Sequence, residues 1–461
     1  MKLHLRIAAT FSALAIIGAS TTAYATTPNG SQDLGFGTSG VATAPSSHDG
    51  DGVRGMIVQP TGKIVAVGFW ATPGYSNGWN FHAARYNRDG SLDSTFGSSG
   101  IYDADISGRH DVPTGYAVQS DGKIIIGGDI EYNSSANYRA TITRITANGA
   151  VDTTFATNGV WIDNRGLRSN LLRMVALPND KLLVTGRNMD GGRAFILRLN
   201  ANGSVDTGFG TAGFVYFDDN GAEKRGVGVL TETSGKVVVA GTSGSQAWAY
   251  RINPDGTLDT TFGTSGEITQ TIGGTELSIT SVLKAGSGYV LTGTVRNGTT
   301  GKKNIVALKI NQNGTMNASF GTSGVSLFTD GASSDMAGIA GVINSKGIIY
   351  ISGVRDVSGT GTSVVAAINP DGELITEFGT NGFAFGQASF YESIAVQSDG
   401  KVLAGGQKDG SFAIERFYGA TIPNISLANT GTNSAGILGF ATIAIVLGGL
   451  VVFMARRQGS R

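Results

Sequence analysis

The sequence predicts an all-β protein, a seven-bladed β-propeller whose blades are four-stranded antiparallel sheets. Three observations predict this fold. A nine-residue block centred on phenylalanine recurs along the chain, a second block with an Asp-Gly-Lys turn recurs between its copies, and no helical periodicity separates them. Repeats of nearly sixty residues that contain only short strands and tight turns are typical of propeller blades.

The first block is recognised by its phenylalanine. Copies include LDSTFGSSG at 92–100, VDTTFATNG at 151–159 and LDTTFGTSG at 258–266. Burying one aromatic ring per blade, ~150–250 Å² of surface, would seal each blade against its neighbour, so we expect these rings in the core. The seven phenylalanines are separated by 60, 59, 54, 53, 58 and 58 residues and are Phe36, Phe96, Phe155, Phe209, Phe262, Phe320 and Phe378.

The second block supplies the inner strands. AVQSDGKIIIGG at 117–128 and AVQSDGKVLAGG at 395–406 are its clearest copies. Each repeat contains two apolar strands around a polar turn, a third strand that ends in Asp-Gly or Asn-Gly, and a fourth strand after the phenylalanine block, as at 160–163 and 214–217. Asp-Gly and Asn-Gly favour tight turns because they accept a positive φ at low cost.

The blocks DGKIIIGG and DGSLDSTFGSSG resemble the delta-60 β-propeller repeats of bacterial surface proteins, over about residues 30–418. This resemblance implies the propeller fold and a place at the cell envelope. It implies no catalytic residues.

Both ends of the sequence predict export. Lys2 and Arg6 precede an apolar run, and Ala23-Tyr24-Ala25 fits the small-x-small cleavage rule, so residues 1–25 are expected to be a signal peptide. Residues 26–418 then form the propeller. Residues 435–455 are apolar and long enough for a transmembrane helix, and the basic tail 456–461 marks its cytoplasmic side.

A linker, 419–434, joins the propeller to this helix. It contains Leu427, Ala428, Asn429, Thr430 and Gly431, which resemble the L-P-x-T-G cell-wall sorting signal in its L-A-x-T-G form. The resemblance implies that a sortase cuts between Thr430 and Gly431 and joins Thr430 to a peptidoglycan precursor. We therefore expect the protein on the extracellular face of the envelope, membrane-spanning before sorting and wall-anchored afterwards. A plain membrane anchor is the alternative.

Composition excludes several classes of function. The chain has no cysteine, and its 34 Lys and Arg balance its 34 Asp and Glu, so thiol chemistry and nucleic-acid binding are not expected. His48, His82 and His110 lack metal-binding spacing, and the G-x-G-x-x-G stretches at 35–40 and 208–213 lack the helix that a dinucleotide site needs. We predict no catalytic residue, metal or cofactor.

The expected function is non-catalytic binding or adhesion. A monomer would hold a carbohydrate, wall polymer or protein ligand on one face of the propeller or in its central channel. The alternative is an extracytoplasmic hydrolase or lyase with its active site in the channel. Several carboxylates and a metal there would favour the enzyme, whereas exposed aromatics such as Trp70, Trp79 and Trp161 would favour binding.

Finally, charge spacing predicts how the ring closes. An arginine stands eight residues before the aspartate of four blocks, as in Arg85 with Asp93, which suggests an ion pair across a hairpin. Arg416 in the last repeat has no downstream aspartate, and Asp33 near the N-terminus has no upstream arginine. We therefore expect Asp33 to pair with Arg416 and residues 30–45 to form the fourth strand of the last blade.

Overall fold

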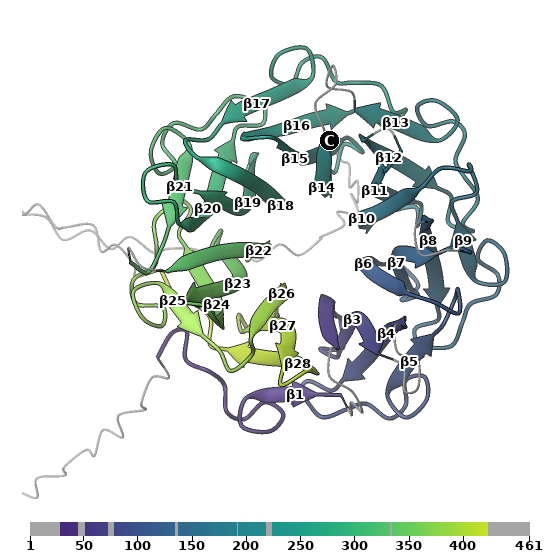
Figure 1. Cartoon of the computed structure of the whole chain (residues 1–461), viewed down its shortest axis with the longest axis horizontal. Coiled ribbons are helices and arrows are strands. Elements are labelled where there is room, and N and C mark those ends of the chain that lie inside the picture. The colour runs from purple at the N-terminus through teal and green to yellow at the C-terminus, as the bar shows by residue number, and fades with distance from the viewer. Residues whose placement is uncertain are drawn as a thin grey trace, which may run out of the picture. The chain divides into compact units, whose positions relative to one another are not determined.

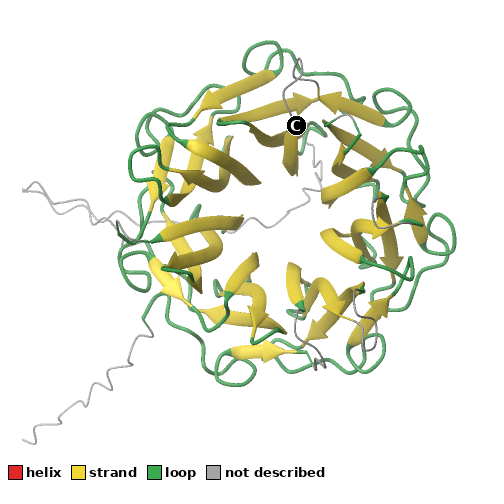
Figure 2. Cartoon of the chain, viewed as in Figure 1, coloured by secondary structure: helices red, strands yellow, loops and turns green. Residues whose placement is uncertain are grey.

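The computed structural model describes residues 28–44, 51–71, 78–133, 137–190, 192–217, 224–331 and 334–422, all within one compact unit. These residues form seven four-stranded antiparallel sheets arranged as a ring (Figure 1). Figure 2 shows strands joined by turns and loops, with no helix in the described parts of the chain. The predicted seven-bladed propeller is confirmed.

We number the blades from 1 to 7 in chain order. Within each blade the strands follow one another from the central axis outward in the order of the chain, except in blade 7. The outermost strand of each blade is short. The strands are β2 (Gly52–Val58), β3 (Ile64–Ala71), β4 (Trp79–Tyr86) and β5 (Ile101–Ala104) in blade 1; β6 (Asp111–Val118), β7 (Ile124–Glu131), β8 (Tyr138–Ile145) and β9 (Val160–Ile162) in blade 2; β10 (Ser169–Ala176), β11 (Leu182–Asn188), β12 (Arg193–Leu199) and β13 (Phe214–Phe217) in blade 3; β14 (Arg225–Thr231), β15 (Val237–Ser243), β16 (Gln246–Ile252) and β17 (Glu267–Thr271) in blade 4; β18 (Thr275–Ala285), β19 (Gly288–Arg296), β20 (Lys303–Ile310) and β21 (Val325–Phe328) in blade 5; β22 (Asp335–Ile343), β23 (Ile349–Val357), β24 (Thr360–Ile368) and β25 (Phe383–Phe385) in blade 6; and β26 (Phe390–Val396), β27 (Val402–Lys408), β28 (Ser411–Phe417) and β1 (Val41–Thr43) in blade 7.

The N-terminal segment closes the ring. Strand β1 pairs antiparallel with β28, with Val41 opposite Glu415 and Thr43 opposite Ala413. In Figure 1 the purple β1 lies beside the yellow β28, so blade 7 is made from both ends of the described chain. Closure in this way leaves no unfinished blade whose edge could pair with another molecule.

The hydrophobic core lies between the blades. All seven repeated phenylalanines are fully buried. Gly90 of blade 1 sits against Phe36 of blade 7, with φ +87°, and a Cβ there would lie 2.6 Å from the Gly37 nitrogen and 2.9 Å from the Phe36 ring. The Gly37 N–H also donates to the Asp89 carbonyl at 2.7 Å. The Asp-Gly turn of one blade therefore closes over the phenylalanine of the preceding blade.

Every inner strand carries a β-bulge close to its first residues. In blade 1 the register shifts between Val53 and Gly55, so Arg54 is the inserted residue. A bulge changes the direction of the neighbouring side chains and increases the local twist. Because every blade has one near the start of its inner strand, the seven bulges surround the channel at one level. The inserted residues are Arg54, Thr114, Leu172, Val227, Thr280, Ile339 and Glu392.

Candidate functional site

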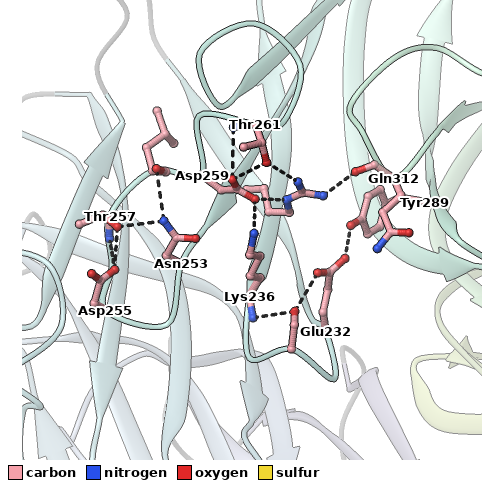
Figure 3. A network of polar contacts seen from close by, with 12 residues as sticks. Glu232, Lys236, Asn253, Asp255, Thr257, Asp259, Thr261, Tyr289 and Gln312 are labelled. Atoms are coloured by element: carbon pink, nitrogen blue, oxygen red, sulfur yellow. Dashed lines mark hydrogen bonds and ion pairs between the residues drawn. The ribbon is translucent and has the colours of Figure 1, made fainter.

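A repeated cluster of charges, which we call the latch, joins neighbouring blades. In blade 4 the Asp259 carboxylate accepts from Lys236 Nζ at 2.7 Å and from Arg251 Nε at 2.6 Å (Figure 3). Thr261 also donates to Asp259, and Arg251 reaches across to the Gln312 carbonyl of blade 5. The latch thus ties one blade to the turn of the next.

Blades 1, 2, 3 and 7 repeat this arrangement. The arginine also lies over the buried phenylalanine of its own blade, with 4.9 Å from the Arg85 guanidinium carbon to the Phe96 ring centre. The hydrogen bond from the Thr154 hydroxyl, together with Arg144 and Lys123, outweighs the effect of burial and lowers the pKa of Asp152 to about 2. The charged groups of each latch pair with one another and hydrogen-bond to the next blade, so their role is structural. The arginine–aspartate pairs are Arg85 with Asp93, Arg144 with Asp152, Arg198 with Asp206 and Arg416 with Asp33.

The structure brings the sequence-predicted closing pair together. Arg416 Nε and Nη2 each lie 2.8 Å from Asp33 Oδ2, and Lys401 Nζ lies 2.8 Å from the same oxygen. Arg416 Nη1 donates to the Arg88 carbonyl of blade 1 at 2.6 Å. Asp33 is 5% exposed and Arg416 is 6% exposed, so the pair is buried.

Blades 5 and 6 depart from the latch. In blade 5 the lysine that replaces arginine, Lys309, donates to the Pro370 carbonyl at 2.8 Å, while Asn317 turns to Asn311. In blade 6 both positions are apolar, Ala367 and Ile375, so the arginine and the aspartate are absent together.

The sorting residues Leu427, Ala428, Asn429, Thr430 and Gly431 lie outside the described residues, as does His48. Within the described ranges no helix is long and apolar enough to cross a membrane. In the same ranges no group of three or more His, Cys, Asp or Glu side chains is placed to hold a metal ion.

The cavity with the richest chemistry is the central channel. It encloses about 170 Å³ and is lined by the inner strands of all seven blades, at and just beyond the ring of bulges. Three lining residues are charged: Glu392 from blade 7, Arg54 from blade 1 and Arg173 from blade 3. Blades 4, 5 and 6 contribute only neutral lining residues, such as Thr280 and Ala340, so the charge is confined to one side.

The charges of the channel are incompletely balanced. Arg54 Nη1 lies 2.6 Å from Glu392 Oε1, yet Arg54 Nε and Glu392 Oε2 are buried without a hydrogen-bond partner among the described residues. Burial raises the pKa of Glu392 despite the two arginines. Arg173 Nη1 donates to the Thr114 and Leu172 carbonyls at 3.0 and 2.9 Å, and burial lowers its pKa.

Aromatic side chains connect this channel to the face where the inner strands begin. The Arg54 guanidinium carbon lies 5.1 Å from the centre of the Phe69 ring, which lies 5.2 Å from Trp79. Trp79 then meets His110 edge-on at 5.1 Å. Trp79 is 38% exposed, whereas Trp70 and Trp161 are half-buried, so Trp79 offers the most accessible tryptophan surface of the three.

Sequence reasoning missed the channel residues, because they differ from blade to blade and no repeat marks them. The signal that could have found them is this variation itself: at the level of the bulge most blades carry neutral residues, but blades 1 and 7 carry Arg54 and Glu392. The latch lysines were also missed. They are visible in the sequence as the lysine of the recurring Asp-Gly-Lys turn, as at Lys123 and Lys401.

Comparison with known proteins agrees with the fold. Four segments, 59–96, 119–155, 177–209 and 233–262, match the family model described as "Domain of unknown function (DUF5122) beta-propeller". These segments correspond to four successive repeats and cover less than half of the chain. Among curated protein sequences, none matches.

Several solved structures are similar to this chain. The WD40 β-propeller domain of Doa1 has 11% identity and a TM-score of 0.45, with 82% of this chain and 97% of that chain covered. A catalytically inactive virginiamycin B lyase from Staphylococcus aureus with quinupristin has 12% identity and a TM-score of 0.47, covering 81% and 98%. A gluconolactonase from Xanthomonas campestris has 11% identity and a TM-score of 0.34, covering 84% and 94%. All three TM-scores lie below 0.5, so none of them bears on function. From its seven sheets and its matching repeats, the chain is a β-propeller repeat protein.

Proposed function

We propose that this chain is a non-catalytic binding module of the cell surface, which holds a carbohydrate, wall polymer or protein at the mouth of its central channel. The observation that carries the proposal is the exposed Trp79, joined through Phe69 to the charged channel. An exposed aromatic ring beside polar groups is a suitable surface for stacking and hydrogen bonding. The charged groups of the latches already form ion pairs within the propeller. We therefore favour the face of the propeller opposite the latches as the binding face.

Trp79 can be tested directly. We expect the full-length chain to bind bacterial cell walls stripped of protein, or components of a glycan array. The Trp79→Ala variant should bind about two- to twelve-fold more weakly, because aromatic contacts contribute ~0.5–1.5 kcal/mol beyond the area they bury. The matched control is Trp161→Ala, which removes a half-buried tryptophan from the outer strand β9. Equal binding by native chain and Trp79→Ala would contradict the proposed site.

We further propose that the module is held at the envelope by its C-terminal segment, with a sortase and a peptidoglycan precursor as partners. The support is the order of features in the sequence: the Leu427–Gly431 motif, an apolar stretch and terminal arginines. A Thr430→Ala variant should leave the muramidase-released wall fraction and remain with the membrane. If it stays in the wall fraction like the native protein, the membrane-anchor alternative is correct.

A hydrolase or lyase is the second candidate, and one observation favours it. Burial raises the pKa of Glu392, and a raised carboxyl pKa is one feature of general acid catalysts. Incubating wall polymer and oligosaccharides with the native chain and with Glu392→Gln separates the two candidates. New chain ends formed by the native chain alone would establish the enzyme.

A further inference from the structure

We propose that the channel binds a small oxyanion, a carboxylate or phosphate group, between Arg54 and Arg173. This inference rests on the proposed function and names the chemistry of the ligand group that enters the channel. It would make the preferred ligand acidic, for example a sugar acid or a phosphate-bearing polymer.

The first argument is the charge balance of the cavity. Its lining contributes two guanidinium groups and one carboxylate, so it carries one more positive than negative charge whenever Glu392 is ionised. When Glu392 is protonated, the excess is two. A buried cation without a counter-ion is costly, and an anion from solution would remove that cost.

Arg173 is the charged residue of the cavity that lacks a carboxylate partner among the described residues. Within the described part of the chain, no carboxylate oxygen lies within 4.0 Å of its guanidinium nitrogens, and the hydrogen bonds of Nη1 go to two backbone carbonyls. Those carbonyls hold the guanidinium in place from the side of blade 2 and of its own blade. Neither carbonyl carries a net charge, and a bidentate contact with an oxyanion is the pairing that a planar guanidinium favours.

The space fits the group. The cavity has a volume of about 170 Å³, and a carboxylate or phosphate group fits in it. Arg54 Nε is a second guanidinium nitrogen of the cavity lining without a hydrogen-bond partner among the described residues, although it is itself buried. The ring of Phe69 under Arg54, followed by Trp79, lies where the rest of the ligand would leave the channel.

Calorimetry with defined probes tests the proposal on the purified full-length chain. Glucuronate and inorganic phosphate should bind, whereas glucose at the same concentration should not, and the affinity for both anions should fall as NaCl is raised. Arg173→Met should weaken anion binding about ten-fold or more, because hydrogen bonds to charged groups are worth ~1.5–3 kcal/mol. The matched control is Arg296→Gln, a blade 5 arginine that pairs with Glu276 outside the channel.

A second variant guards against misfolding as an explanation. Glu392→Gln removes the competing carboxylate from Arg54, so it should tighten anion binding by about two- to ten-fold, a gain that a damaged protein would not show. Anion affinity unchanged in both Arg173→Met and Glu392→Gln, or no anion binding by the native chain, would overturn the proposal. Wall-polymer binding that is lost in Trp79→Ala but intact in Arg173→Met would refute the oxyanion site alone. Binding of glucuronate or phosphate without any binding of wall material or glycans would instead refute the proposed function and leave the oxyanion site standing.

Discussion

Replacing Asp33 with alanine should weaken the propeller at the place where its two ends meet. The Asp33 carboxylate accepts hydrogen bonds from Arg416, Lys401 and Tyr418, and it also caps the Gly35 N–H. Without it, the guanidinium of Arg416 stays buried between blades 7 and 1 and has lost the one carboxylate with which it pairs among the described residues. The retained bond from Arg416 to the Arg88 carbonyl prevents this side chain from turning freely to solvent.

The size of the effect follows from burial. Breaking one partner of a buried ion pair costs ~3–5 kcal/mol, against ~0–1 kcal/mol for an exposed pair. Asp33 and Arg416 are 5% and 6% exposed, so the larger range applies. A domain of roughly 390 residues has an unfolding entropy of about 0.8 kcal/mol/K, so the melting temperature should fall by about 4–6 °C. The double variant Asp33→Ala with Arg416→Met should fall less, because it leaves no buried charge.

A matched variant separates the loss of a latch from the loss of closure. Asp93→Ala removes the equivalent aspartate of blade 1, whose strands are continuous in sequence. Scanning calorimetry should give similar melting temperatures for the two variants. Hydrogen exchange should differ, because only Asp33→Ala frees β1 to detach from β28 below the melting temperature. A melting temperature within about 1 °C of native, or β1 amides as protected as those in Asp93→Ala, would refute this account of closure.

Three further predictions concern the latch aspartates, a turn glycine and the hydrogen bond of Tyr350. First, the latch aspartates have lowered pKa values, so their stabilisation is present above the ordinary value of 3.8 and is lost as pH falls toward about 2, the value for Asp152; a melting temperature that does not drop between pH 4 and pH 2 would contradict it. Second, Gly90→Ala should cost several kcal/mol more than the ~1–2 kcal/mol of Gly108→Ala, because both residues have positive φ but only Gly90 has neighbours that a Cβ would meet; equal midpoints in urea unfolding would be the contrary result. Third, Tyr350→Phe should cost ~1–3 kcal/mol, because the N–H of Ala420 loses its acceptor at 2.8 Å; urea unfolding measures it, and an unchanged midpoint would show that this bond contributes nothing.

The fold could be predicted almost completely because the same pattern of strands and turns recurs seven times in the sequence. Each phenylalanine and each Asp-Gly turn is a weak signal alone, but their recurrence at nearly constant spacing leaves one architecture. Closure could also be predicted, because Arg416 and Asp33 are the two unmatched members of a spacing that four other blocks share. The third latch member, the lysine, was missed because it lies in a different block, and the ends of two hairpins meet only in the folded blade.

The candidate site could not be predicted for the opposite reason. A function placed on a repeat scaffold lies where the repeats differ, and a difference at one position does not show which other side chains share its cavity. Arg54, Arg173 and Glu392 are separated by more than a hundred residues along the sequence, and only the ring brings them to one cavity. Whether a given inner-strand residue faces the channel depends on the bulge beside it, and a bulge moves that alternation by one position.

Blade 6 shows how the propeller compensates for a missing latch. Its arginine and aspartate positions are Ala367 and Ile375, and both are buried. Tyr350 packs against Phe378 at 5.8 Å and accepts the Ala420 N–H, so the segment that leaves the propeller covers the place where a latch would otherwise stand. A buried ion pair gains little over well-packed apolar groups of similar volume, so this exchange need not weaken the blade. The residues after β28 therefore lie between blades 6 and 7. Among them is Tyr418, whose hydroxyl donates to Asp33. The residues that directly follow the last strand and the closure of the ring therefore depend on the same few contacts.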